Sequence, residues 1–537
     1  MDAVTSNIAE SAEHNGRTNA SDNRAVSEAY VTRIPIAFAR RHNIIGLEPD
    51  EHGTMPLLAA PPVDVNIIDN VSIRLGLPVR VVETPSEEAQ RHINSAYSAQ
   101  DSGVELAIDA AGNGESIRHL NALGTGNDLL DHSGSAPVIK IVNMVLLEAI
   151  KRRASDVHIQ PFAKHVQIRL RIDGVLYDYV QPPLHLLDEI VSRIKIIGCM
   201  DIAEKRLPQD GRTTVSIGER VVDLRISSLP SSCGERVVIR LLDKSARLYS
   251  LSEIGMEDDV RDAFVKAVRR SHGIVLVTGP TGSGKSTTLY AVLQELNAKE
   301  LNILTLEDPI EYELTGISQT QVSAKKGMTF ASGLRTVLRQ DPDVIMVGEI
   351  RDEETARMAV QSALTGHLVL STLHTNDAAG AVTRLLDLGI EPYLVASSLL
   401  AVLAQRLVRR ACTGCKQMAP LSDPEIFALN VNPHVHASLH VASCTGCDSC
   451  MSTGYFERVG IFEMLHVTDT VRRLIVQRGE AAAIKEAAIK EGMKTLRQDA
   501  IDKLFAGETT VTEVNRVTQA SQDDVDEAHA TPTGVDG

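Results

Sequence analysis

The sequence predicts an α/β fold divided among several domains. One segment has the order strand, loop, helix: the apolar run 274–278 precedes a glycine-rich stretch, and the helical run 289–293 follows it. A second segment, 138–241, begins with helical periodicity and continues as runs of alternating polar and apolar residues, a pattern typical of strands with one buried face. At 537 residues the chain exceeds the ~250–300 residues at which a single core stops growing, so we expect about three or four domains.

The composition argues against several classes of protein. No apolar stretch reaches the ~18 residues that a membrane-spanning helix needs, and residues 1–24 lack the basic and apolar regions of a signal peptide. We therefore expect a cytoplasmic protein that is at most peripheral to a membrane. A net charge of −16 leaves no diffuse basic face for a nucleic acid, and the absence of Trp leaves few rings for base stacking. No nucleic-acid partner is expected.

Changes in composition divide the first half of the chain into four segments. Residues 1–23 are rich in Ser, Asn, Ala and Glu and should be disordered. Residues 24–98 hold short apolar runs and a closing helical stretch, which is typical of a small α/β domain. Residues 99–134 contain six Gly with many Asp, Asn and Ser and predict a flexible linker. Residues 135–245 form the strand-rich domain, with a helix over 138–152 and strands over 156–159, 166–171, 213–217, 221–226 and 236–241.

The second half is divided in the same way. Residues 246–410 surround the glycine-rich stretch and form the largest expected domain. Residues 411–455 are a cysteine-bearing insert, and 456–518 are expected to be a helical region because they are rich in Ala, Glu and Lys. Residues 519–537 are a polar, acidic tail that should be disordered.

Residues 279–287 match the pattern G-x-x-x-x-G-K-[ST] of a phosphate-binding loop. In such a loop the glycines let backbone N–H groups surround phosphates, the lysine reaches the β and γ oxygens, and the hydroxyl after it binds Mg²⁺ at a helix N-terminus. A glycine-rich turn with a chance lysine is the alternative, but the flanking strand and helix favour ATP with Mg²⁺. The expected binding residues are Gly279, Pro280, Thr281, Gly282, Ser283, Gly284, Lys285, Ser286 and Thr287, with Ser286 on Mg²⁺.

Two further strands should end in acids at the same edge of the sheet, where ligands of parallel sheets bind. The run 301–306 ends in Glu307, and the run 344–347 is followed by Glu349. Gly348 stands where an aspartate usually precedes such a glutamate, so a scaffold that binds nucleotide without hydrolysing it remains an alternative. A third strand is flanked by His367 and His374, and each is either a structural residue or a catalyst.

The seven cysteines fall into two groups. Cys199 and Cys233 stand alone, and we expect them to be buried thiols. The other five crowd residues 412–450, and two C-x-x-C pairs in this segment resemble a structural Zn²⁺ site closed by four thiolates. Cys412 and Cys415 form the first pair. The spacing alone leaves the second pair open, because 444/447 and 447/450 both fit.

Four motifs in order resemble those of the ATPases of type II secretion and type IV pilus assembly. The segments 279–287, 305–311, 339–352 and 365–377 resemble the Walker A, Asp box, Walker B and His box of that family, and 154–158, 171–176 and 206–212 match upstream. The resemblance covers residues 135–518 strongly and 26–98 weakly. It implies a RecA-like motor domain joined to a smaller, PAS-like domain, in a homohexamer with ATP at the seam between the two domains.

The resemblance also implies roles for individual residues. Gly348 is common in the family, so its presence no longer argues against hydrolysis. Glu349 becomes the candidate to polarise the attacking water and to hold Mg²⁺ through its shell, with Glu307 as a second acid. Arg225 and Arg240 match the family's nucleotide-facing arginines in the smaller domain, and such an arginine contributes ~10³–10⁵ in rate.

His374 joins these catalytic candidates as part of the His box. The residues after the insert match the family when Cys447 and Cys450 complete the zinc site with Cys412 and Cys415, which leaves Cys444 spare. Gln160 stands where the family commonly carries Glu.

Residues 31–43 resemble the start of the secretion ATPases' first domain, which docks on a bitopic inner-membrane protein. The resemblance therefore favours a type II secretion ATPase on the cytoplasmic face of the inner membrane, which drives pseudopilus assembly and works with that bitopic protein and a polytopic platform protein. A type IV pilus assembly ATPase is the main alternative. A non-hydrolysing nucleotide scaffold and a DNA-handling ATPase remain as lesser ones.

Overall fold

The computed structural model divides into two compact units, residues 1–245 and 246–537. The expected disordered ends, 1–23 and 519–537, and residues 100–134 of the expected linker lie outside the described residues. In the part that is described, no helix is both long and apolar enough to cross a bilayer. The structure describes residues 25–34, 36–50, 52–61, 63, 65–99, 137–217, 220–243, 249–296, 299–323, 326–431 and 440–518.

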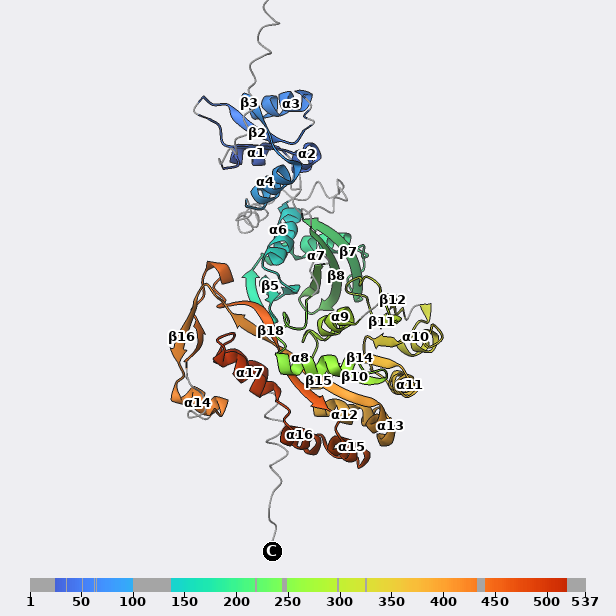
Figure 1. Ribbon diagram of the computed structural model, residues 1–537. Helices are drawn as coiled ribbons and strands as arrows, with labels where there is room; N and C mark the ends of the chain where they lie inside the picture. Colours follow the sequence, from blue (N-terminus) through green and yellow to red (C-terminus); the bar gives the residue numbers. More distant parts are fainter. Residues whose placement is uncertain are drawn as a thin grey trace, which may run out of the picture. The chain divides into compact units, whose positions relative to one another are not determined.

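The first unit begins with a small α/β domain over residues 25–99 (Figure 1). Its central strand pairs antiparallel with the first strand and parallel with the third. Helices pack around the strands and bury an apolar core. The elements are α1 (Glu28–Arg33), α2 (Ile36–His42), β1 (Ile44–Gly46), β2 (Met55–Ala59), α3 (Val65–Leu75), β3 (Val79–Glu83) and α4 (Ser86–Ala99).

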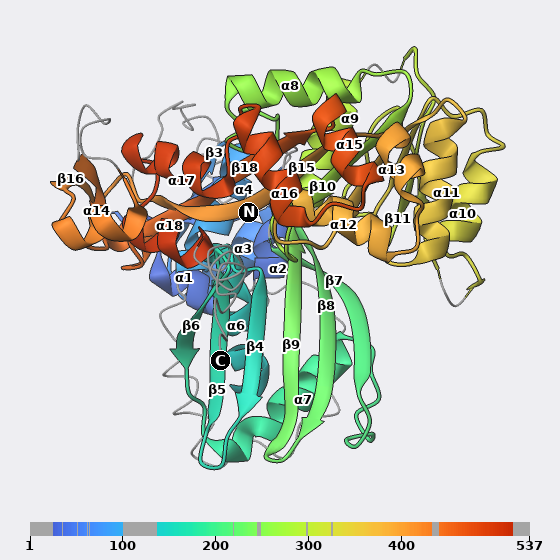
Figure 2. The same cartoon turned by 90° about the horizontal axis from the view of Figure 1, so that it is seen from below.

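The second part of this unit is a six-stranded antiparallel sheet in the order β6-β5-β4-β9-β8-β7. Figure 2 shows two helices, α6 and α7, on one side of it. Strand residues such as Val157, Ile168 and Leu224 pack against these helices, so their neighbours along each strand lie on the opposite, polar face. The elements are α6 (Pro137–Lys151), β4 (Asp156–Pro161), β5 (Val166–Ile172), β6 (Val175–Val180), α7 (Leu187–Ile197), β7 (Gln209–Ile217), β8 (Arg220–Ser231) and β9 (Gly234–Asp243).

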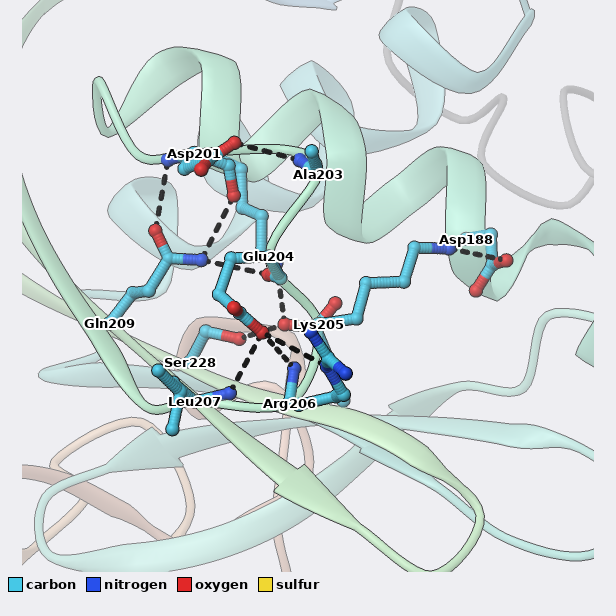
Figure 3. Close-up of polar contacts among 11 residues, drawn as sticks. Asp188, Asp201, Ala203, Glu204, Lys205, Arg206, Leu207, Gln209 and Ser228 are labelled. Atoms are coloured by element: carbon cyan, nitrogen blue, oxygen red, sulfur yellow. Dashed lines mark hydrogen bonds and ion pairs between the residues drawn. The ribbon is translucent and has the colours of Figure 1, made fainter.

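The motif 206–212 spans the end of the loop between α7 and β7 and the start of β7, and polar contacts fix this loop (Figure 3). Gln209 donates to the carbonyls of Asp201 and Glu204 at 2.9 and 3.0 Å. Lys195, which is buried, donates to the Glu204 carbonyl at 2.6 Å and pairs with Glu235 at 2.6 Å. A buried ion pair is tolerated when hydrogen bonds satisfy it, and here they hold the loop against the sheet.

Cys199 and Cys233 were expected to be buried, and both are exposed instead. Cys199 lies just after α7 in a left-handed conformation (φ +54°). Cys233 lies in the turn between β8 and β9. Turns of this kind lie on the surface, so an apolar sequence context did not decide the burial of these thiols.

The second unit contains a seven-stranded sheet in the order β12-β11-β13-β14-β10-β15-β18. Its strands are parallel except for β18, which pairs antiparallel with β15. Together with the first unit this confirms the predicted α/β class. The strands are β10 (Gly273–Thr278), β11 (Ile303–Glu307), β12 (Ser318–Gln321), β13 (Val344–Val347), β14 (Leu368–Leu373), β15 (Leu399–Ala411) and β18 (Tyr455–His466).

Helices cover both faces of this sheet. On one face, α8 and α9 form a core with strand residues such as Val275 and Leu370. On the opposite face, the four helices α10, α11, α12 and α13 form a second core with Leu276 and Val369. This burial on both sides explains why the parallel strands are continuous apolar runs. The helices are α8 (Asp258–Val268), α9 (Lys285–Glu295), α10 (Phe330–Val337), α11 (Glu353–Leu364), α12 (Ala378–Asp387) and α13 (Pro392–Ser398).

Residues 456–466 were expected to belong to a helical region, and they form strand β18 instead. Long antiparallel pairing with β15 decides this, with Val459 opposite Val408 and Leu465 opposite Val402. Helices begin only at Asp469. The remaining elements are β16 (Lys416–Pro420), α14 (Asp423–Leu429), β17 (His440–Cys444), α15 (Asp469–Val476), α16 (Ala481–Lys490), α17 (Leu496–Phe505) and α18 (Val511–Thr518).

Candidate functional site

The loop 279–284 connects the carboxyl end of β10 to the start of α9 and has the backbone that its glycines allow. Gly279 has a φ of +148°, and a Cβ there would lie 2.3 Å from the carbonyl oxygen of Gln405. Gly284 also has a positive φ, +87°, and forms the N-cap of α9. Both positions therefore require glycine, the first for a close approach and the second for a left-handed turn.

Lys285 is the first residue of α9 and folds back over this loop. Its Nζ donates to the carbonyls of Gly279 at 2.8 Å and Pro280 at 3.0 Å. Burial lowers the pKa of Lys285 to about 8, although the charge of Glu349 opposes this shift. The ammonium is thus held next to the loop by weak acceptors that an anion can replace.

The loop fits a phosphate group. Ser283 is 3% exposed, and its hydroxyl is buried without a hydrogen-bond partner among the described residues. A buried hydroxyl without a partner costs free energy, and a phosphate oxygen would satisfy it. Ser286, in the first turn of α9, is exposed and carries the hydroxyl suited to Mg²⁺. The residues present therefore suit both phosphate and Mg²⁺.

Glu349 follows β13 and lies close to Lys285 and His374. His374 Nε2 is 3.5 Å from Glu349 Oε2, and the Glu349 side chain is 13% exposed. Arg351 pairs with the other carboxylate oxygen of Glu349. The structure thus brings together an acid, a half-exposed histidine and the loop lysine at one edge of the sheet.

Glu307 lies differently from what its position at the end of β11 suggested. Its side chain is buried and accepts hydrogen bonds from Tyr290 of α9, from Thr305 at 2.6 Å and from Gln319 at 3.0 Å. Burial and the Glu307 carboxylate raise the pKa of Tyr290. This carboxylate therefore ties α9 to β11 and β12, and each of its two oxygens already accepts at least one hydrogen bond.

The two histidines that flank β14 have different surroundings. His367 precedes the strand, at the edge opposite to the phosphate loop, and its Nδ1 is 2.9 Å from the Ser362 carbonyl. His374 follows the strand and reaches Glu349. The geometry gives His367 a structural contact and leaves only His374 near the loop.

Arg225 and Arg240 lie directly opposite each other on β8 and β9 of the first unit. They belong to a row across the polar face of the sheet that continues to Asp156, Arg171 and Arg212 on neighbouring strands. Arg240 contacts Asp156 at 3.0 Å, and its side chain is 55% exposed. Asp156 and Asp223 pair with three of the four arginines, which leaves the row a net positive charge.

The sulfurs of Cys412, Cys415, Cys447 and Cys450 all lie within 4.8 Å of one another. The separations of neighbouring sulfurs include 3.7 Å for Cys412 with Cys447 and 3.9 Å for Cys415 with Cys450. Four sulfurs at ~2.3 Å from a tetrahedral Zn²⁺ stand about 3.8 Å apart. Cys444 is not in this group, although its spacing to Cys447 had allowed it.

One thiol of the group is prepared as a thiolate. Burial alone would raise the pKa of Cys450, but hydrogen bonds from the N–H groups of Cys447 at 3.1 Å and Gly454 at 3.2 Å lower it to about 6. Metals bind the thiolate form, so the donor set fits Zn²⁺.

Sequence reasoning missed several residues of the nucleotide site. Gln405 packs against the phosphate loop, and its side chain accepts from Thr288 at 2.7 Å. Thr278 and Thr375 place their hydroxyls 2.7 Å apart at the base of the loop. Thr375 stood inside the noted segment 365–377, and Thr278 ends the apolar run just before the phosphate loop, so a signal was present for both, whereas nothing in the local sequence marks Gln405.

Known proteins are similar to this chain over most of its length. The family model described as type II/IV secretion system protein matches residues 131–516, and that of the MshEN domain matches residues 20–103. Type II secretion system protein E of Aeromonas hydrophila is 47% identical over 492 residues, which cover 91% of this chain and 97% of that protein. Type II secretion system ATPase E of Vibrio cholerae is 46% identical over 494 residues, with 91% and 97% covered. The structure of the Legionella pneumophila ATPase DotB has a similar fold, with a TM-score of 0.52 at 22% identity over 74% of this chain and all of that one.

Proposed function

Because the chain belongs to the family of type II/IV secretion system proteins, we propose that it is an ATPase that powers a type II secretion system. The Vibrio cholerae relative is named as an ATPase, and the relatives match this chain over nearly their whole length. The observation that carries the proposal is the site itself: a phosphate loop whose lysine lies close to Glu349. Relatives named for type II secretion favour this machine over type IV pilus assembly.

The chemistry follows from the position of each residue. The N–H groups of loop 279–284, the Ser283 hydroxyl and Lys285 bind the phosphates, and Ser286 holds Mg²⁺. When bound there, Mg²⁺ would supply positive charge that offsets the charge of the phosphate oxygens. Glu349 orients the attacking water and accepts its proton, with His374 beside it. Glu307 holds α9 through Tyr290 and so positions the loop instead of acting on the water.

Arg225 and Arg240 would supply cations to the phosphates, as the resemblance to the secretion ATPases implies. Their row of arginines on the polar face of the sheet supports this role, because positive charge at the γ-phosphate stabilises the transition state. We propose a homohexamer, peripheral on the cytoplasmic face of the inner membrane, that drives pseudopilus assembly with a bitopic and a polytopic membrane partner.

We propose Zn²⁺ for the group of four cysteines. Its thiolates leave no open position for a substrate, so the metal would close the insert and take no part in hydrolysis.

The test is ATP turnover by the full-length protein with Mg²⁺. Lys285→Ala should abolish nucleotide binding, and Glu349→Gln should retain binding while turnover falls by about 10² or more. Undiminished turnover in both variants would refute the assigned roles. A wild-type protein that binds ATP and releases no phosphate, even on membranes that hold its partners, would instead support a non-hydrolysing scaffold.

A further inference from the structure

The loop 374–377 joins β14 to α12, and each of its residues contacts a different part of the second unit. His374 faces Glu349. The N–H of Thr375 donates to Thr278 Oγ1 at 3.0 Å, and Thr278 directly precedes the phosphate loop. Asn376 contacts Arg406 of β15. The position of this short loop therefore affects both the carboxylate of Glu349 and the residue from which the phosphate loop begins.

Asp377 ends the loop and fixes the start of α12. Its Oδ1 accepts from the N–H of Gly380 at 2.8 Å, which makes it the N-cap of that helix. Its backbone carbonyl accepts from Thr375 Oγ1 at 2.9 Å. Its remaining oxygen, Oδ2, accepts from Lys485 Nζ at 2.9 Å. One carboxylate thus joins the loop to α12 and, through Lys485, to α16.

Lys485 lies between two carboxylates in a mostly buried position. The side chains of Lys485 and Asp377 are 18% and 23% exposed, and Glu463 is 1% exposed. Glu463 accepts from the N–H groups of Ala378 and Leu496 at 2.9 and 3.3 Å, so it also holds the start of α12. Burial lowers the pKa of Lys485, but the charges of Glu463 and Asp377 raise it by more than burial lowers it. The net pKa is above the ordinary value, so the lysine is charged at neutral pH.

We propose that Lys485 is a positioning residue for ATP hydrolysis, which acts by holding Asp377 and with it the loop 374–377. Through this contact α16, a helix of the C-terminal region, keeps His374 against Glu349 and Thr375 against Thr278. A movement of α16 then changes turnover without any contact with the nucleotide. The inference rests on the proposed ATPase function and adds a control point to it.

The test compares two lysines of α16 in the full-length protein. Lys485→Met keeps the side-chain length and removes the charge. Lys490→Met is the matched control, because in the described part of the chain Lys490 pairs with Glu486 on the exposed surface. Lys485→Met should lower kcat on the order of tenfold and change KM for ATP by less than about twofold. Lys485→Arg should restore most of kcat, and Lys490→Met should match the wild type.

A second variant tests the route through the loop. Asp377→Asn keeps an N-cap residue for α12, so the helix should still form. If Lys485 acts through Asp377, kcat of the double variant with Lys485→Met should be within about twofold of the lower single variant. Wild-type kcat in Lys485→Met, or losses that multiply in the double variant, would overturn the proposal.

Hydrogen exchange gives a readout that needs no turnover. The amides of Thr375, Ala378 and Gly380 should exchange faster in Lys485→Met than in the wild type or in Lys490→Met. Equal exchange would overturn the proposal whether or not the purified protein hydrolyses ATP. If the wild-type protein hydrolyses no ATP but the exchange pattern is as expected, the result would count against the proposed function alone.

Discussion

Lys285 should make ATP binding depend on pH between 7 and 9. Burial lowers its pKa to about 8 in the free protein, and among the described residues its Nζ donates hydrogen bonds to the carbonyls of Gly279 and Pro280. Phosphate oxygens bind the charged ammonium, which carries its proton in about nine-tenths of chains at pH 7 and about one-tenth at pH 9. Because bound ATP raises the pKa again, the apparent Kd for Mg²⁺-ATP should increase about tenfold over this range.

The assay is an equilibrium titration of the full-length protein with a fluorescent ATP analogue at constant ionic strength and excess Mg²⁺. Lys285→Arg is the matched control, since a guanidinium stays charged throughout and should give weaker binding with no pH dependence. The same Kd at both ends of the range in the wild type would refute the reasoning, and so would an equal slope in Lys285→Arg.

Three further outcomes follow from the structure. Glu349→Gln should lower kcat by about 10² or more, while Glu307→Gln should lower it by less than about tenfold and mainly reduce the melting temperature, as calorimetry and turnover together would show. Elemental analysis should detect Zn²⁺ in the wild type and in Cys444→Ser, and should detect none in Cys447→Ser. Burial alone would raise the pKa of Glu513, but hydrogen bonds from two arginines lower it to about 2. The stability that this carboxylate contributes is therefore present above pH ~4.5 and lost as the pH falls toward 2, up to about 3 kcal/mol, so hydrogen exchange of α18 should rise in acid and Glu513→Gln should remove this dependence.

The phosphate loop could be predicted from sequence because its determinants are local. The strand expected over 274–278 is β10, Gly273–Thr278, and α9 begins at Lys285 where the motif places it. The same holds for Glu349 at the end of β13, since neighbouring parallel strands end at one edge.

The hydrogen bonding of Glu307 and the strand formed by residues 456–466 depend on distant parts of the chain, so the sequence did not predict them. The hydrogen-bond donors to Glu307 include Tyr290 and Gln319, which belong to other elements, so no local pattern showed that its oxygens were occupied. In β18 the buried Glu463 interrupts the apolar residues, because it holds two helix N-termini. The pattern of a half-buried strand was therefore absent, and pairing with β15 made the strand.

The cysteine group lies where the segment 412–454 leaves the seven-stranded sheet and returns to it. Ala411 and Tyr455 pair directly at the ends of β15 and β18, so the sulfurs tie the two ends of the segment at its base. Loop-closure entropy increases only slowly with length, and the ends here are already joined. The exposed residues between β16 and β17 can therefore be lengthened or replaced while the strands keep their register, whereas Leu421, Leu429 and Val431 belong to the core of the second unit. This makes the segment the suitable place to insert an affinity tag or a fluorophore that reports on the working protein.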